Sequence, residues 1–145
     1  MKINIKKLTE TATTPKRGTK YSAGYDLYAD IAEPITIQPN STVKIPTNIS
    51  MEIPVGYFGA IYARSGLAIK HGLRPANCVG VIDADYRGNI IVALHNDKNE
   101  EYTIKVGERI AQIIIQPFLS IEFNVVDELN ETIRGEGGFG STGIK

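Results

Sequence analysis

The sequence predicts an all-β fold, because apolar residues alternate with polar ones and turn residues recur at short intervals. In TVKIPTNISMEIP (42–54) the apolar side chains lie two or four residues apart, with polar residues between them. Side chains of a strand point to opposite faces in turn, so this alternation is typical of half-buried strands. Pro46 and Pro54 indicate an edge or bulge and then a stop. Many short strands between glycine and proline turns predict a sandwich or barrel.

Further segments have the Ile- and Val-rich character of strands. They are INIKKL (3–8), NIIVALHN (89–96), YTIKV (102–106), AQIIIQPF (111–118) and IEFNVV (121–126). Only GLAIKHG (66–72) could form one or two helical turns. No repeat or change of composition precedes the glycine-rich end, so we expect one β domain over residues 1–133 and an arm over 134–145.

The composition restricts the classes of partner. Sixteen basic and sixteen acidic side chains cancel, so no overall field attracts the chain to nucleic acid or to a membrane surface. The single cysteine, Cys78, excludes an internal disulfide framework and suits a reducing compartment. No apolar run reaches the length of a membrane span, and MKINIKKLTE lacks the apolar core of a secretory signal. We therefore expect a cytoplasmic protein (in the host cell, if the source is a virus or phage) that binds neither nucleic acid nor membrane.

Common catalytic centres find no support in the sequence. His71 and His95 have no cysteine or second histidine at the spacing of a zinc site. Cys78 has no evident partner, and beside Val79 it suits the role of a small buried residue. A GxSxG motif for serine nucleophile chemistry is missing.

The segment ARSGLAIKHGL (63–73) contains groups that suit a phosphate. Arg64 supplies a forked guanidinium, Ser65 a hydroxyl, and Gly66 a backbone N–H that a ligand can approach closely. The alternative is an ordinary turn at the end of a strand, with the arginine on the surface.

The segment GVIDADYRGNI (80–90) contains groups that suit hydrolysis. Asp83 follows a short apolar strand, and a carboxylate fixed at a strand end can orient and deprotonate a water. Tyr86 could stack on a ligand or pack in the fold. The alternative is that Asp83 and Asp85 only form the turn that leads to Gly88.

Two polar side chains stand in apolar strands, and the arm repeats the phosphate-binding theme. Gln112 and Asp26 each need hydrogen-bond partners, which neighbouring backbone and arginines or a ligand could supply. In RGEGGFGSTGIK (134–145) arginine, serine and threonine suit a phosphate, and phenylalanine suits a nucleobase. The alternative is a disordered terminus, the usual state of such segments.

Five segments together resemble the trimeric dUTP pyrophosphatase family, in order and in spacing. They are AGYDLYA (23–29), ARSGLAIKHGL (63–73), NCVGVIDADYRGN (77–89), GERIAQI (107–113) and RGEGGFGSTG (134–143). The resemblance spans nearly the whole chain. It implies a distorted β jelly roll, a homotrimer with active sites shared between subunits, and a C-terminal arm that closes over the site. The reaction it implies is hydrolysis of dUTP to dUMP and pyrophosphate, with Mg²⁺ held by the triphosphate and water and not by protein ligands.

The resemblance also implies a role for each matching residue. Asp83 matches the residue that activates the water attacking the α-phosphorus. Tyr86 matches the platform beneath the deoxyribose that leaves no room for a 2′-hydroxyl. The expected uracil pocket is formed by Asn77 and by the backbone of two strands, at Gly80, Val81, Ile82 and Ile91.

The remaining matches concern the phosphates and the arm. Arg64, Ser65 and Gly66 match the phosphate turn, Gln112 matches an amide that serves the phosphates, and Asp26 is expected to support the arginine. In the arm, Arg134, Ser141 and Thr142 resemble γ-phosphate ligands, and Phe139, next to Gly140, resembles a lid over uracil.

Three alternative functions remain to be compared with this one. A dCTP deaminase would share the fold, but it needs a glutamate in the strand after the GVID turn, where NIIVALHN (89–96) has no carboxylate and Ala93 falls near that place. A non-catalytic nucleotide-binding module would not require Asp83, Tyr86 and the whole arm together. A nucleic-acid binder would need a basic, aromatic face, which a net charge of zero does not favour.

Overall fold

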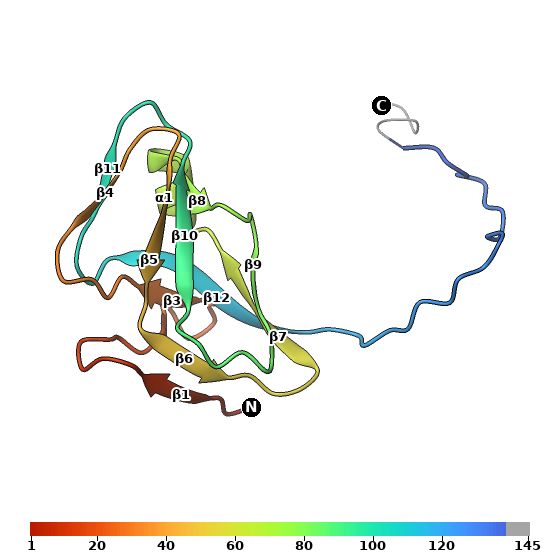
Figure 1. Cartoon of the computed structure of the whole chain (residues 1–145), viewed down its shortest axis with the longest axis horizontal. Coiled ribbons are helices and arrows are strands. Elements are labelled where there is room, and N and C mark those ends of the chain that lie inside the picture. The colour runs from red at the N-terminus through yellow and green to blue at the C-terminus, as the bar shows by residue number, and fades with distance from the viewer. Residues whose placement is uncertain (139–145) are drawn as a thin grey trace.

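The computed structural model describes residues 1–138, which form an almost entirely β structure with one short helix (Figure 1). The described elements, in chain order, are β1 (Asn4–Lys7), β2 (Lys16–Arg17), β3 (Tyr25–Tyr28), β4 (Ile35–Ile37), β5 (Thr42–Pro46), β6 (Ile49–Glu52), β7 (Tyr57–Tyr62), α1 (Ser65–His71), β8 (Leu73–Pro75), β9 (Gly80–Ile82), β10 (Ile91–Asn96), β11 (Tyr102–Ile104) and β12 (Arg109–Pro117). The all-β prediction is therefore confirmed.

The strands form antiparallel sheets that join distant parts of the chain. The largest sheet has the order β2-β3-β12-β7-β9, and a second has the order β5-β10-β8. Two further pairs are β1 with β6 and β4 with β11. Because β12 lies between β3 and β7, it brings residues near 26, 62 and 112 side by side. Two of the segments singled out in the sequence, 23–29 and 107–113, thus meet in one sheet beside the strand that leads into 63–73.

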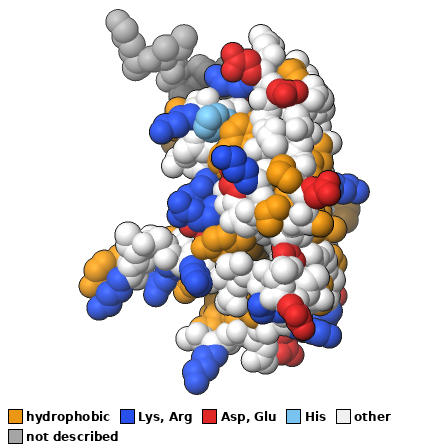
Figure 2. All heavy atoms as spheres, turned by 90° about the vertical axis from the view of Figure 1, so that its left-hand side faces the viewer, with side chains coloured by type: hydrophobic (Ala, Val, Ile, Leu, Met, Phe, Trp, Pro, Cys, Tyr) orange, Lys and Arg blue, Asp and Glu red, His pale blue; other side chains and the backbone are white. Residues whose placement is uncertain are grey.

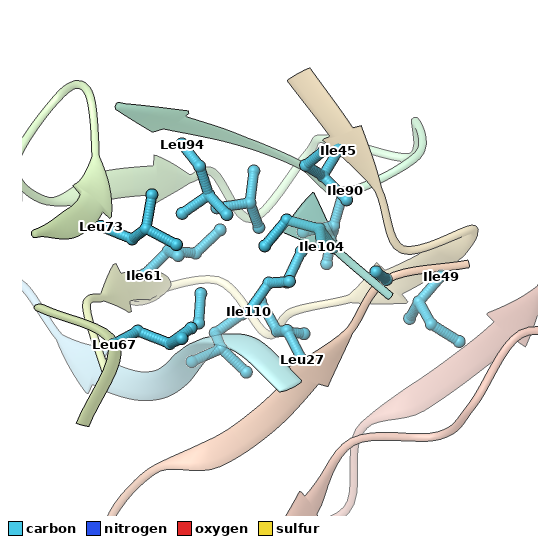
Figure 3. Close-up of a cluster of buried hydrophobic side chains, with 14 of the residues drawn as sticks. Leu27, Ile45, Ile49, Ile61, Leu67, Leu73, Ile90, Leu94, Ile104 and Ile110 are labelled. Carbon is cyan, nitrogen blue, oxygen red and sulfur yellow. The ribbon is translucent and has the colours of Figure 1, made fainter. Parts of the chain in front are cut away.

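An aliphatic core fills the space between the sheets. The labelled side chains in Figure 3 come from many different elements and point toward one another. Leu27, Ile45, Leu94, Ile104 and Ile110 are fully or almost fully buried. Burial of one such side chain contributes roughly 1.5–3 kcal/mol. On the face shown in Figure 2, charged side chains of both signs lie among hydrophobic and other residues.

Most of the expected strands are present. Residues 42–54 form two strands, β5 and β6, and β5 ends at Pro46 as the prolines predicted. The residue that turns the chain between them, Asn48, has a φ of 49°, in the left-handed region that asparagine tolerates. The segments 3–8, 89–96 and 102–106 contain β1, β10 and β11, and 111–118 covers all but the first two residues of β12.

The helical turn expected at 66–72 is helix α1. Leu67 is its buried residue, and Lys70 and His71 stand in the last turn, where positive charge complements the helix dipole. Gly72 ends the helix with a φ of 66°, and its N–H donates to carbonyls of the last turn. That left-handed end is the reason why a glycine stands there.

The strand expected at 121–126 is a wrong prediction for the single chain. After β12 the chain leaves the body as an extended segment without described helix or strand (Figure 1). Its apolar side chains face solvent, with exposed fractions of 85% for Leu119, 89% for Phe123 and 94% for Val125. An alternating segment forms a strand only where a sheet edge pairs with it, and this segment pairs with no described strand of its own chain. The division into a domain of residues 1–133 and an arm from 134 stays a prediction.

Candidate active site

The first group of site residues, the arginine cluster, consists of Asp26, Arg64, Arg109 and Gln112. In the sheet register, Gln112 of β12 lies opposite Asp26 of β3 on one side and Tyr62 of β7 on the other. Arg64 follows β7 by two residues and is the N-cap position of α1. The cluster is therefore assembled by strand pairing between three segments that are far apart in sequence.

Asp26 holds two arginines at once. Its Oδ1 accepts a hydrogen bond from Arg64 Nε at 2.9 Å, and its Oδ2 accepts one from Arg109 Nη1 at 3.0 Å. Arg64 Nη1 also donates to the backbone oxygen of Arg109 at 3.3 Å. The Asp26 side chain is 14% exposed, and those of Arg64 and Arg109 are 25% and 49% exposed. Both guanidiniums are therefore held by a largely buried carboxylate and remain accessible to solvent. Such a pair of guanidiniums can bind phosphate oxygens.

Arg109 is the member that the sequence reasoning missed. It stands in GERIAQI, the same segment as Gln112, at the first position of β12. The register of β12 against β3 shifts between Arg109 and Ala111. That irregularity decides which way the first residue of the strand points, and strand periodicity alone does not contain it.

Gln112 is held on both sides of its amide. Its Nε2 donates to the carbonyl of Ala63 at 2.9 Å, just before the phosphate-type turn. Its other side lies against Gly24, where a Cβ would stand 3.0 Å from Gln112 Cδ and closer still to Oε1. Gly24 is therefore a packing requirement of this side chain. The hydrogen bond links Gln112 to the backbone that leads into Arg64.

Ser65 and Gly66 lie exposed at the start of α1. The first N–H groups of a helix have no partner inside the helix, and no side chain caps them here. The structure thus places both residues beside Arg64, where their N–H groups and the serine hydroxyl are open to solvent.

The second group of site residues surrounds a pocket of about 250 Å³, called here the Tyr86 pocket. It is lined by Val81, Ile82, Asp83, Tyr86, Asn89 and Ile91. β9 is an edge strand of the large sheet, paired only with β7 among the described residues, so its outer backbone groups face this side. Asn77 is exposed and does not line the pocket, although its Nδ2 lies near Gly80. Most of the residues expected around the nucleoside are therefore brought together.

Tyr86 has a fixed orientation at the rim of this pocket. Its hydroxyl donates to the carbonyl of Asn89 at 2.9 Å, and its backbone N–H donates to the carbonyl of Asp83 at 3.2 Å. The ring lies over Gly88, where a Cβ would stand 2.5 Å from Tyr86 Cζ. The ring is 43% exposed, so one face remains available.

Asp83 is exposed, and none of the described side-chain hydrogen bonds or ion pairs involves its carboxylate. It lines both the Tyr86 pocket and a larger, open groove of about 770 Å³ with Lys2, Asp85 and Arg87. The carboxylate is therefore available to a water or a ligand approaching from either side.

The two groups of site residues lie at opposite ends of β7. In the register, Gly59 is opposite Ile82 and Ile61 is opposite Gly80, so the continuation of β9 to Asp83 points to the beginning of β7. Arg64 lies beyond the other end of β7. About six residues at roughly 3.3 Å each separate the two levels, which gives a distance of about 20 Å along the sheet.

The arm is only partly described. Arg134 donates from Nε to the carbonyl of Gly137 at 2.9 Å, within its own segment. Phe139, Gly140, Ser141 and Thr142 lie outside the described residues.

Within residues 1–138, no group of three or more His, Cys, Asp and Glu side chains is placed to hold a metal. In the arginine cluster both oxygens of the Asp26 carboxylate already accept from guanidiniums, so the cluster suits phosphate oxygens and not a cation. In the same part of the chain, no helix is long and apolar enough to cross a membrane.

Comparisons with known proteins agree with this arrangement. A family model described as dUTPase matches residues 10–143. A deoxyuridine 5′-triphosphate nucleotidohydrolase of Desulfitobacterium hafniense is 47% identical over 145 residues, covering 99% of this chain and 96% of that protein. A dUTPase variant of Staphylococcus bacteriophage 80alpha, solved with dUpNHpp, superposes with a TM-score of 0.89 at 32% identity and 99% coverage of both chains.

A second similar solved structure contains a metal ion. It is a variant dUTPase of phage phi11 of S. aureus that shows the coordination of a structural Mg(II) ion. Its TM-score is 0.81 at 27% identity, covering 90% of this chain and all of that one. With the family model spanning nearly the whole chain and a curated relative at such identity, the chain belongs to the dUTPase family.

Proposed function

We propose that this chain hydrolyses dUTP to dUMP and pyrophosphate, which removes dUTP from the DNA precursors and supplies dUMP for dTMP synthesis. The observation that carries the proposal is the Tyr86 pocket, in which a free carboxylate stands beside a fixed aromatic ring and an open strand edge. Family membership supports the choice of substrate.

In the proposed mechanism, uracil lies against the edge of β9, near Asn77, Gly80, Val81 and Ile91. A strand edge can distinguish uracil from cytosine, because the donor and acceptor order at one edge of the base is reversed. Tyr86 packs beneath the deoxyribose and excludes a 2′-hydroxyl. Its fixed hydroxyl and the contact with Gly88 keep the ring from moving aside.

Asp83 accepts a proton from the attacking water. The oxygen of that water then forms a bond to the α-phosphorus, and the bond from the α-phosphorus to the bridging oxygen breaks, so that pyrophosphate leaves. A positioned general base of this kind contributes roughly 10²- to 10⁴-fold to the rate. Phosphoryl substitution needs little covalent help, so positioning and charge stabilisation supply the remainder.

The arginine cluster binds the phosphates in this proposal. Arg64, Ser65 and Gly66 contact them directly, Gln112 orders the turn, and Asp26 keeps Arg64 in place. Mg²⁺ bound through the triphosphate and water would supply positive charge against the leaving pyrophosphate, while the residues of the chain hold the phosphates themselves. Arg134, Ser141 and Thr142 add contacts to the γ-phosphate, and Phe139 with Gly140 covers the base, as the resemblance implies.

We further propose that the active chain is a homotrimer whose sites are shared between subunits. Asp83 and Arg64 both have to reach the phosphates of one nucleotide, yet within one chain they stand about 20 Å apart along β7. Two copies placed with one chain's Tyr86 pocket beside another's arginine cluster bring them together. The exposed apolar side chains of 119–126 need a cover, and a neighbouring copy provides one.

A substrate panel tests the activity. The protein is incubated with Mg²⁺ and dUTP, UTP, dCTP or dTTP, and pyrophosphate and ammonia are measured. We expect pyrophosphate from dUTP far above the other three, and no ammonia from dCTP. Ammonia release would instead favour the deaminase, and no turnover of any substrate would favour a non-catalytic module.

A subunit-mixing experiment tests the shared site. Asp83→Asn and Arg64→Ala are each expected to be nearly inactive as pure proteins. After mixed refolding, about a quarter of the sites in randomly assembled trimers would combine two intact halves, and activity would return to that level. Activity that stays at the level of the pure variants would place both residues in one chain's site. Wild type refolded alone controls for recovery.

A further inference from the structure

We infer that Asn48 is a positioning residue for the proposed reaction: through Asn89 it fixes the turn that carries Tyr86, and so contributes to the rejection of ribonucleotides. The inference rests on the proposed function, in which Tyr86 excludes a 2′-hydroxyl. Asn48 lies in the turn between β5 and β6, in none of the five motifs and in no wall of the Tyr86 pocket.

The orientation of Tyr86 depends on the peptide group of Asn89. The tyrosine hydroxyl has its acceptor there, at 2.9 Å, and the ring rests on the adjacent Gly88. A rotation of the Asn89 carbonyl would therefore release the far end of the ring. That end is the part which has to resist a 2′-hydroxyl.

Asn89 is in turn held by its side chain. Its Nδ2 donates to Asn48 Oδ1 at 2.6 Å, which joins the segment before β10 to the turn between β5 and β6. Asn48 Nδ2 donates to the side chain of Asp30 at 2.8 Å and to its backbone carbonyl at 3.2 Å. Thr9 also donates to that carboxylate. A chain of hydrogen bonds thus runs from the N-terminal segment to the acceptor of the Tyr86 hydroxyl.

The fold itself does not require this bridge. The next residue, Ile90, is fully buried, and its N–H donates to Ile49 O at 2.9 Å. Its carbonyl accepts from both the N–H and the hydroxyl of Thr47, at 3.1 and 2.7 Å. The backbone after the turn is therefore anchored without the amide pair. The hydrogen bond between the Asn48 and Asn89 side chains adds the orientation of the turn before Ile90.

Replacing Asn89 allows the positioning of Tyr86 to be tested with little effect on the stability of the fold. Asn89 Oδ1 is buried and has no hydrogen-bond partner among the described residues. Asn89→Ala thus removes one hydrogen bond together with one unpaired acceptor, and these have opposite effects on the free energy of unfolding. Because the two effects partly offset each other, we expect Asn89→Ala to change substrate discrimination with little loss of stability.

The test compares kcat/KM for dUTP and UTP in wild type, Asn48→Gly, Asn89→Ala and the double variant. Glycine preserves the left-handed backbone at position 48 and removes only the amide. Asn40→Gly is the matched control, because Asn40 is also left-handed, with a φ of 54°, but lies in the turn between β4 and β5. The ratio of Kd for UMP to Kd for dUMP, measured by calorimetry, gives a second readout that does not depend on turnover.

We expect the dUTP preference to fall about tenfold in both single variants, the size of effect that the loss of one hydrogen bond produces. The double variant should fall no further, since both substitutions break the same bridge. UTP should gain mainly through a lower KM, and Asn40→Gly should keep the wild-type preference. A wild-type preference in Asn89→Ala would overturn the inference even if Asn48→Gly fails to fold. Wild type without any preference for dUTP would refute the proposed function itself.

Discussion

Replacing Gly24 by alanine should disturb the arginine cluster from a position that contains no functional group. A Cβ at this position would stand 3.0 Å from Cδ and 3.2 Å from Cβ of Gln112, and closer still to its Oε1. The glutamine amide therefore has to rotate away. That rotation breaks its hydrogen bond of 2.9 Å to the carbonyl of Ala63.

The expected cost follows from these contacts. Loss of the hydrogen bond with a half-buried carbonyl left unpaired costs about 1–3 kcal/mol, and residual crowding adds to it. Alanine loses less conformational entropy on folding than glycine, which stabilises the variant by about 0.5–1 kcal/mol. The net destabilisation should be about 1–3 kcal/mol. For a chain of this size, this corresponds to a fall of roughly 3–10 °C in Tm.

Thermal unfolding at one fixed chain concentration measures this effect, since Tm of an oligomer depends on concentration. Gly18→Ala is the control, because its Cβ would meet only Ser22 Oγ at 3.8 Å. The double variant Gly24→Ala/Gln112→Ala should be less destabilised than the sum of its two single variants, since the shorter side chain removes the clash. Equal stability of Gly24→Ala and Gly18→Ala, or strict additivity in the double variant, would refute the packing argument. Under the proposed function, Gly24→Ala should also raise KM for dUTP.

Two further predictions concern pH. Burial, with a further contribution from Glu108, raises the pKa of Tyr102 to about 12. The tyrosine therefore ionises first in the unfolded chain, and the free energy of unfolding should fall as pH rises from about 10 to about 12. Urea unfolding should show a flatter dependence of stability on pH over that range for Tyr102→Phe. Burial alone would raise the pKa of Asp30, but hydrogen bonds from Thr9 and Asn48 outweigh it and lower the pKa below its ordinary value. Asp30 thus stabilises the fold above its ordinary pKa of 3.8 and loses that effect as pH falls through the lower folded pKa. Asp30→Asn should therefore lose less stability than wild type as pH falls from about 5 to below that ordinary value, and a wild-type acid profile would contradict this assignment.

The alternating segments made the fold class predictable, because long alternation is visible without knowledge of the partner strand. It located β5, β6, β10 and β12, and a glycine at the right distance located the end of α1. The two-residue strand β2 has no periodicity to detect. The segment at 121–126 has the periodicity but no partner in its own chain, so pattern and structure disagree there.

The site was predictable to the extent that its residues lie inside motifs. Asp26, Arg64 and Gln112 were named from the sequence and share one cluster. Arg109 was missed because a register shift orients it, and Asn48 was missed because its partner is 41 residues away. Contacts of this kind depend on which turns are adjacent after the sheets have formed, and that adjacency is a property of the topology.

The glycines of the motifs separate into two kinds, and the difference bears on the phosphate turn. Gly24 and Gly88 are each in contact with a polar side chain of the site, Gln112 and Tyr86, so the fold itself excludes a larger residue there. Gly66 differs, because a Cβ at that position would meet nothing within 4 Å and its φ lies outside the left-handed region. The described chain therefore gives no internal reason for glycine at the start of α1. A ligand that approaches the backbone closely, as a phosphate would in the proposed site, supplies one.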